Sequence, residues 1–152
     1  MTKPRILRVR IRVVNRSGHP LPQYMTEGSV GMDLRAHLRD IITIYPMERV
    51  LIPTGIFVEI PPGYEAQIRP RSGLAAHKGL TILNSPGTID SDYRGEIKVL
   101  LINLSSEPQY IQNGDRIAQM VVAPTAHVVW DSSDTLSKTS RGEGGYGHTG
   151  EN

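Results

Sequence analysis

Turn-forming residues interrupt this chain so often that no long regular element fits between them. The 152 residues include 15 glycines and 11 prolines. Proline fixes φ and lacks an N–H donor, and glycine adopts conformations that other residues avoid, so clusters of the two end helices and strands. Such clusters stand at residues 18–22, 61–63, 85–87 and 113–115. We therefore expect an all-β chain of many short strands.

The segments between these turns have the composition of strands. Strands are expected over residues 31–38, 41–44, 49–52, 55–60, 65–69, 80–83, 95–104, 116–122 and 126–130. A further strand runs through residues 8–13, where arginines alternate with aliphatic residues as in a half-buried strand with a solvated face. Only residues 72–78 have a helical pattern, and Ser72 stands where its hydroxyl could cap the first turn.

Composition limits the kinds of partner. The sequence has no cysteine, which excludes disulfides and the usual zinc spacings. No apolar run approaches the roughly 20 residues that span a bilayer, so we expect no membrane partner and a cytoplasmic protein. A formal net charge of +2 is too small to argue for duplex nucleic acid. A domain of this length can bury a real core.

The end of the chain differs from the rest. From residue 132 onward Ser, Thr, Gly and charged residues dominate, with no apolar periodicity. Such a segment cannot bury itself. We expect a β-barrel domain over residues 1–131 and a glycine-rich arm over residues 132–152.

An arginine, a hydroxyl and a glycine meet at the start of the expected helix, in Arg71-Ser72-Gly73. Free N–H groups at a helix start favour an anion, and a guanidinium donates hydrogen bonds in a fork that matches phosphate oxygens. The segment predicts a phosphate site. The alternative is that Ser72 only caps the helix and Arg71 is only a surface charge.

Residues 84–95 lie between two strand patterns and combine acidic with aromatic side chains. A hairpin here would present backbone N–H and C=O groups that can pair with the edge of a flat heterocycle. Asp90 or Asp92 could act as a general base, with the ring of Tyr93 beside it. The alternative is an ordinary acidic turn with a capping aspartate.

Two other segments are chemically unusual. Gln119 places an amide among apolar neighbours, where it is either a satisfied structural amide or a ligand contact. Over residues 140–150 the glycines would let N–H groups converge on an anion, and Tyr146 could lie on a base. The alternative for this tail is a flexible linker.

Five segments, taken in order, resemble the five motifs of the trimeric dUTPase family. They are residues 31–36 (GMDLRA), 71–75 (RSGLA), 87–95 (GTIDSDYRG), 114–119 (GDRIAQ) and 141–150 (RGEGGYGHTG). The resemblance runs from about residue 6 to the end. It implies a distorted jelly-roll β-barrel or sandwich with one short helix and a flexible C-terminal arm. It also implies a homotrimer in which the arm closes a neighbouring subunit's active site.

The same resemblance implies hydrolysis of dUTP to dUMP and pyrophosphate, which supplies dUMP for thymidylate synthesis and keeps uracil out of DNA. Asp90 would activate the water that attacks the α-phosphorus, a role worth roughly 10²–10⁴ in rate. Mg²⁺ would be the cofactor, held mainly by the substrate's triphosphate, with Asp33 acting indirectly through water.

Contacts to the substrate are implied residue by residue. Uracil would pair with Asn84 and with the turn of Thr88, Ile89 and Asp90. Tyr93 would lie against the deoxyribose and obstruct a 2′-hydroxyl, and Lys98 would border the nucleoside. The phosphates would contact Arg71, Ser72, Gly73, Gln119, Arg141 and Thr149.

Two arm residues depart from the family pattern. Tyr146 stands where Phe is usual and still stacks, whereas His148 replaces a Ser and removes a hydroxyl expected near the terminal phosphate. Two rival functions remain on the same fold. A dCTP deaminase would need a catalytic glutamate in its core, and Glu59 and Glu65 only flank a turn. A non-catalytic nucleotide-binding regulator would lack Asp90 or the arm, and both are present.

Overall fold

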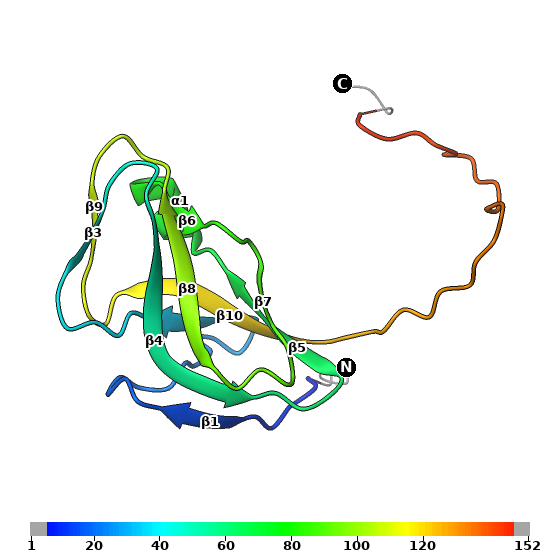
Figure 1. Ribbon diagram of the computed structural model, residues 1–152. Coiled ribbons are helices and arrows are strands. Elements are labelled where there is room, and N and C mark those ends of the chain that lie inside the picture. Colours follow the sequence, from blue (N-terminus) through cyan, green and yellow to red (C-terminus); the bar gives the residue numbers. More distant parts are fainter. Residues whose placement is uncertain (1–5, 148–152) are drawn as a thin grey trace.

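The computed structural model describes residues 6–147, which form ten strands and one short helix (Figure 1). The strands are β1 (Arg12–Asn15), β2 (Met32–Arg35), β3 (Ile42–Ile44), β4 (Arg49–Glu59), β5 (Tyr64–Arg69), β6 (Leu80–Ile82), β7 (Gly87–Ile89), β8 (Glu96–Asn103), β9 (Gln109–Ile111) and β10 (Arg116–Pro124). The helix is α1 (Ser72–Lys78). The predicted all-β class is confirmed.

Two four-stranded sheets carry the fold, in the orders β1-β4-β8-β6 and β2-β10-β5-β7. A two-stranded sheet, β3-β9, accompanies them, and every pairing is antiparallel. β7 and β8 are consecutive in the chain, yet they belong to different sheets. The segment between them must therefore cross from one sheet to the other.

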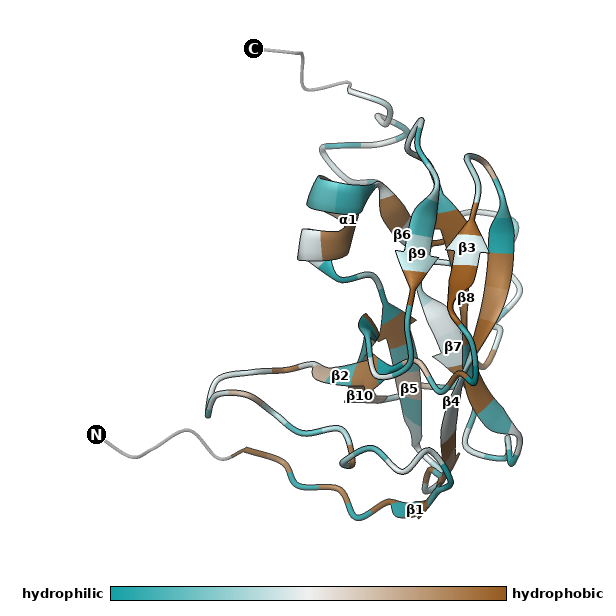
Figure 2. Cartoon of the chain, turned by 90° about the vertical axis from the view of Figure 1, so that its left-hand side faces the viewer, coloured by the Kyte–Doolittle hydropathy of each residue, from teal (hydrophilic) through white to brown (hydrophobic). Residues whose placement is uncertain are grey.

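An aliphatic core joins these sheets. Its members come from both large sheets, for example Leu34 on β2, Ile52 on β4, Ile68 on β5 and Val99 on β8, all at most 3% exposed. Figure 2 shows hydrophobic residues concentrated on β3, β6 and β8. Burying such side chains is worth about 1.5–3 kcal/mol each, so this core is the main term that holds the sheets face to face.

The helix has the predicted bounds, but its predicted cap is wrong. Arg71 is the N-cap residue, without a side-chain cap hydrogen bond, and Ser72 is already the first helical residue. The chain stays extended only through Arg71, at φ −91° and ψ 126°, so the helix begins one residue too early for Ser72 to cap it. This helix has only seven residues, and no helix in residues 6–147 is both long and apolar enough to cross a membrane.

Long-range pairing corrects several predicted strands. Residues 49–52 and 55–60 join in one strand, β4, whose pairing with β8 is irregular between Pro53 and Phe57 around Gly55 at φ 69°. Glycine tolerates this left-handed conformation, so the strand bends there without ending. β9 was not predicted, and the hairpin expected over residues 84–95 does not form, because β7 pairs with β5.

The two ends also differ from the expected pattern. β1 begins only at Arg12, and all four of its residues are exposed at the edge of a sheet, so the half-buried strand over residues 8–13 is wrong. No strand forms over residues 126–130, where the described part of the chain offers no neighbouring strand. Residues 126–147 run clear of the sheets without helix or strand (Figure 1), and Trp130 is 87% exposed.

A buried asparagine ties β8 to its surroundings. Asn103 is fully buried, and its Nδ2 donates to the carbonyl oxygens of Ile44 and Glu107, both at 2.8 Å. Its Oδ1 accepts from the backbone N–H of Ser105 at 2.9 Å and from the Ser105 hydroxyl at 2.7 Å. The amide's hydrogen-bonding capacity is thus fully used, as burial of a polar group requires.

We expect Asn103→Leu to lower the free energy of unfolding by about 2–4 kcal/mol, because each buried polar group left unpaired costs roughly 1–3 kcal/mol. Urea denaturation followed by circular dichroism, at one fixed protein concentration, measures the change. Ser106→Ala, at an exposed neighbouring position, is the matched control and should stay within about 0.5 kcal/mol of the parent. Equal stability of the two variants would contradict a structural role for the amide.

Candidate active site

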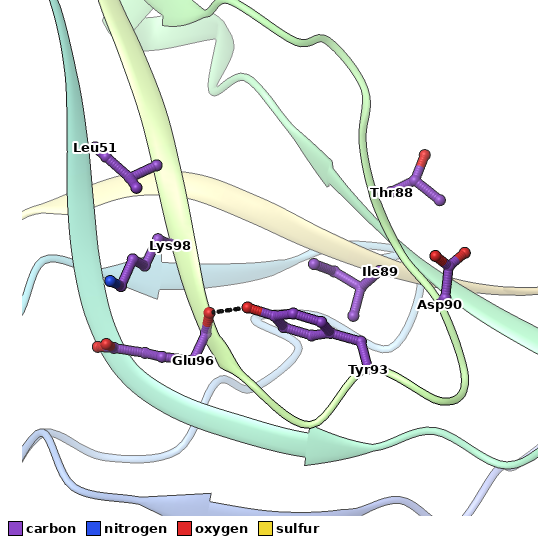
Figure 3. Close-up of a pocket in the computed structure, with 7 residues that line it drawn as sticks. All are labelled: Leu51, Thr88, Ile89, Asp90, Tyr93, Glu96 and Lys98. Atoms are coloured by element: carbon purple, nitrogen blue, oxygen red, sulfur yellow. Dashed lines mark hydrogen bonds between the residues drawn. The ribbon is translucent and has the colours of Figure 1, made fainter.

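A pocket of about 490 Å³ lies between β7 and β8 (Figure 3). It brings together five of the predicted site residues, namely Thr88, Ile89, Asp90, Tyr93 and Lys98. β7 and the turn that follows it supply the first four of these side chains, and β8 supplies Lys98. The pocket therefore lies where one sheet's edge faces a strand of the other sheet.

β7 is an edge strand, which pairs with β5 at the end of its sheet. The pairing joins Ala66 to Ile89, Gln67 to Thr88 and Ile68 to Gly87. An edge strand keeps backbone N–H and C=O groups unpaired on its outer side. The backbone groups expected to pair with a flat heterocycle are thus provided by a sheet edge, and not by the predicted hairpin.

Asp90 begins the turn that crosses to the second sheet. The Tyr93 N–H donates to the Asp90 carbonyl at 3.2 Å, and the Arg94 guanidinium donates to the Ser91 and Tyr93 carbonyls at 2.7 and 3.0 Å. Within residues 6–147 the Asp90 carboxylate has no hydrogen-bond partner, and the residue is exposed. A carboxylate held on a fixed turn with both oxygens available can accept a proton from water.

A cluster of charged side chains forms around Asp33 on β2. One of its carboxylate oxygens accepts from Arg71 Nε at 3.0 Å, and the other accepts from Arg116 Nη1 at 3.4 Å. Arg71 Nη1 also donates to the Arg116 carbonyl at 3.1 Å. These contacts orient the Arg71 guanidinium at the start of α1, beside the exposed residues Ser72 and Gly73.

The two arginines also line a second pocket, of about 220 Å³, together with Leu74, Lys78, Ile111, Asp115 and Ile117. Three cationic side chains and one carboxylate surround this space, which suits an anionic group. Among the described residues, none lines both pockets.

Gln119 lies beside this cluster on the central strand β10, opposite Asp33 on β2 and Arg69 on β5. Its half-buried amide donates from Nε2 to the Pro70 carbonyl at 3.0 Å. Gly31 makes room for it, since a Cβ at residue 31 would lie 3.3 Å from Gln119 Cδ. The amide therefore has the structural partner that one alternative anticipated.

Within residues 6–147, the remaining predicted residues do not line either pocket. Asn84 is exposed, and its Nδ2 would lie 3.5 Å from a Cβ at Gly87. Arg141 donates to the nearby Gly144 carbonyl, at 2.8 Å, and Tyr146 is exposed on the extended tail (Figure 1). Thr149 and His148 lie outside the described residues.

Sequence patterns missed several residues that line these pockets. Leu51 and Glu96 line the first pocket, and Lys78 and Arg116 line the second. Arg116 belongs to the GDRIAQ segment, so that motif could have indicated it. Leu51 and Glu96 reach their pocket through the pairing of β4 and β8, for which the local sequence gives no signal.

Comparison with known proteins adds independent information. A family model for dUTPase matches residues 18–150. The deoxyuridine 5′-triphosphate nucleotidohydrolase of Finegoldia magna is 52% identical over 142 residues, covering 93% of this chain and 99% of that protein. The enzyme of the same name from a Wolbachia of Brugia malayi is 56% identical over 153 residues, covering 96% and 98%.

Solved structures agree on the fold. The dUTPase of Staphylococcus bacteriophage 80alpha with dUPNHPP superposes with a TM-score of 0.80 at 24% identity, covering 93% of this chain and 98% of that one. A mutant dUTPase from phage phi11 of S. aureus, described with a structural Mg(II) ion, gives a TM-score of 0.73 at 21% identity, covering 85% and 99%. The chain belongs to the dUTPase family, and its activity is that of a dUTP diphosphatase.

Proposed function

We propose that Asp90 activates the water that attacks the α-phosphorus of dUTP in the pocket between β7 and β8. The observation that carries this proposal is the unpaired Asp90 carboxylate, which within residues 6–147 shares one pocket with Tyr93, Lys98 and the free edge of β7. In the step, Asp90 takes a proton from water, the water oxygen bonds to the α-phosphorus, and the bond from that phosphorus to the bridging oxygen breaks. Pyrophosphate leaves and dUMP remains.

The same pocket recognises the nucleoside. Thr88, Ile89 and Asp90 offer backbone groups to uracil at the open sheet edge, and the Asn84 amide contributes from the preceding loop. Tyr93 lies against the deoxyribose, and Lys98 borders the nucleoside from the opposite strand. Backbone groups in a fixed strand favour one planar partner, because a base with different edge groups would leave them unpaired.

The phosphates bind to groups outside this pocket. Arg71, oriented by Asp33, contacts them together with Ser72, Gly73 and Gln119. From the arm, Arg141 and Thr149 add contacts, and Tyr146 lies on the base. Preorganised donors of this kind stabilise the charge that develops on leaving pyrophosphate.

Assembly as a homotrimer would complete the site. Among the described residues of one chain, no residue lines both the pocket that contains Asp90 and the second pocket, which contains Arg71. The described part of the arm lies away from both pockets (Figure 1). Val129 and Trp130 are 93% and 87% exposed, and apolar side chains so exposed mark contact surfaces. We therefore assign residues 1–131 to the catalytic domain and residues 132–152 to an arm that closes a neighbour's site.

Mg²⁺ fits this arrangement as a substrate-held ion. In the described part of the chain no three His, Cys, Asp or Glu side chains converge, so the triphosphate and water would supply most of the oxygens that this ion prefers. Each Asp33 oxygen accepts one guanidinium hydrogen bond and keeps a further lone pair, which suits contact through a metal-bound water. When bound, Mg²⁺ neutralises phosphate charge.

We expect Asp90→Asn to lower kcat by roughly 10²–10⁴, the usual worth of a placed general base. Nucleotide binding should persist, because the amide keeps the shape of the pocket. Pyrophosphate release measures turnover, and titration calorimetry measures dUTP binding. Asp92→Asn, an exposed carboxylate in the same turn, is the control for charge. Turnover equal in the two variants would exclude Asp90 as the base.

Removing residues 140–152 should leave the trimer intact and strongly reduce dUTP turnover, because the deleted segment carries the proposed phosphate contacts and its described residues 140–147 lie outside the core. Sedimentation of the full chain and the truncated chain measures assembly, and pyrophosphate release measures activity. A full chain that sediments as a monomer would contradict the trimer. A truncated chain that retains full turnover would contradict the role of the arm.

The deaminase alternative is tested by incubation with dCTP and with dUTP. Glu96 lines the pocket, and its Oε1 accepts from the Gly55 N–H at 2.8 Å, which ties this carboxylate to β4. We expect pyrophosphate from dUTP in the presence of Mg²⁺. Release of ammonia from dCTP would refute the hydrolase mechanism.

A further inference from the structure

The Tyr93 ring is tied down although it lies at the surface. Its side chain is 42% exposed, yet the hydroxyl donates to the backbone carbonyl of Glu96 at 2.9 Å (Figure 3). The backbone N–H of the same residue donates to the Asp90 carbonyl. The tyrosine is therefore fixed at its backbone to the turn that carries the Asp90 carboxylate and at its hydroxyl to the start of β8.

The ring also rests on a glycine. A Cβ at Gly95 would lie 2.5 Å from Tyr93 Cζ and 3.0 Å from Cε2, closer than these atoms can approach. The φ of Gly95 is outside the left-handed region, so other residues could adopt its backbone conformation. Any larger residue at this position would have to displace the ring, because the ring occupies the space of a side chain.

Glu96, whose carbonyl holds the ring, is itself anchored to β4. Glu96 Oε1 accepts from the Gly55 N–H at 2.8 Å, and the Gly55 carbonyl accepts from the Arg16 N–H at 2.8 Å. Gly55 adopts φ 69° in the irregular part of β4, and a Cβ there would lie 2.8 Å from the Ser17 nitrogen. Glu96 is thus held in place both by its side chain, through the Gly55 N–H, and by its backbone, through the pairing of β8 with β4.

We propose that Gly95 and Glu96 are positioning residues that hold the Tyr93 ring in one orientation and thereby set discrimination against ribonucleotides. This inference rests on the proposed placement of Tyr93 against the sugar. A loose apolar pocket rejects an added hydroxyl only about 10²-fold. A ring that cannot turn or retreat leaves a 2′-hydroxyl no space, and the proton of its own hydroxyl, already donated to Glu96, is not available to the ribose.

The test is the ratio of kcat/KM for dUTP to kcat/KM for UTP, measured for the full chain and its variants. Gly95→Ala should lower this ratio by about tenfold or more, because the added methyl displaces the ring. Glu96→Ala should lower it as well, whereas Glu96→Gln keeps an oxygen for the Gly55 N–H and should remain within about threefold of the parent. Tyr93→Phe, which keeps the ring but loses the tie to Glu96, should also lower it.

Circular dichroism melting curves show which variants fold. A folded Gly95→Ala chain with the parent ratio would overturn the proposal, and so would equal ratios for Glu96→Ala and Glu96→Gln. If Gly95→Ala fails to fold, Tyr93→Phe and the Glu96 pair decide the question. If the parent protein hydrolyses UTP as well as dUTP, the proposed contact between Tyr93 and the sugar is wrong. This failure of the proposed function would be seen with the parent protein, before any substitution is made.

Discussion

Packing of the aliphatic core between the two four-stranded sheets determines where the chemical groups of this chain lie. β7 closes one sheet and β8 lies inside the other, so the chain must cross between sheets over residues 90–95. The turn bearing Asp90 and Tyr93 thus follows from the distance between two packed layers.

The charged contacts around Asp33 orient the side chains of Arg71 and Arg116 more than they stabilise the fold. The ion pair of Arg71 with Asp33 is partly solvated, with side chains 25% and 23% exposed. Such pairs contribute little to stability, since solvent screening and side-chain ordering offset the attraction. The position of Asp33 is nevertheless well defined, because Asp33 on β2 lies directly opposite Gln119 on β10. The arrangement therefore holds a guanidinium ready for an anion.

Sequence patterns predicted the elements that depend on local chemistry. The helix over residues 72–78 and most strands follow from composition and from turns, and the five motifs indicated the family. The patterns failed where a partner distant in the chain decides the outcome. β7 pairs with β5 and leaves the expected hairpin unformed, and residues 126–130 find no neighbouring strand within the described part of the chain. Glu96 reaches the pocket only because β4 pairs with β8.

The proposed site residues differ in how far their side chains are held in place before a nucleotide binds. Tyr93 and Arg71 are held by hydrogen bonds within the folded domain, whereas Tyr146 lies exposed on a segment that runs clear of the sheets. Ordering such a segment costs roughly 1–2 kcal/mol per residue, so an arm that closes over bound substrate needs compensating contacts with the phosphates. Under the trimer proposal, discrimination of base and sugar is therefore built into a rigid domain, and closure depends on the triphosphate.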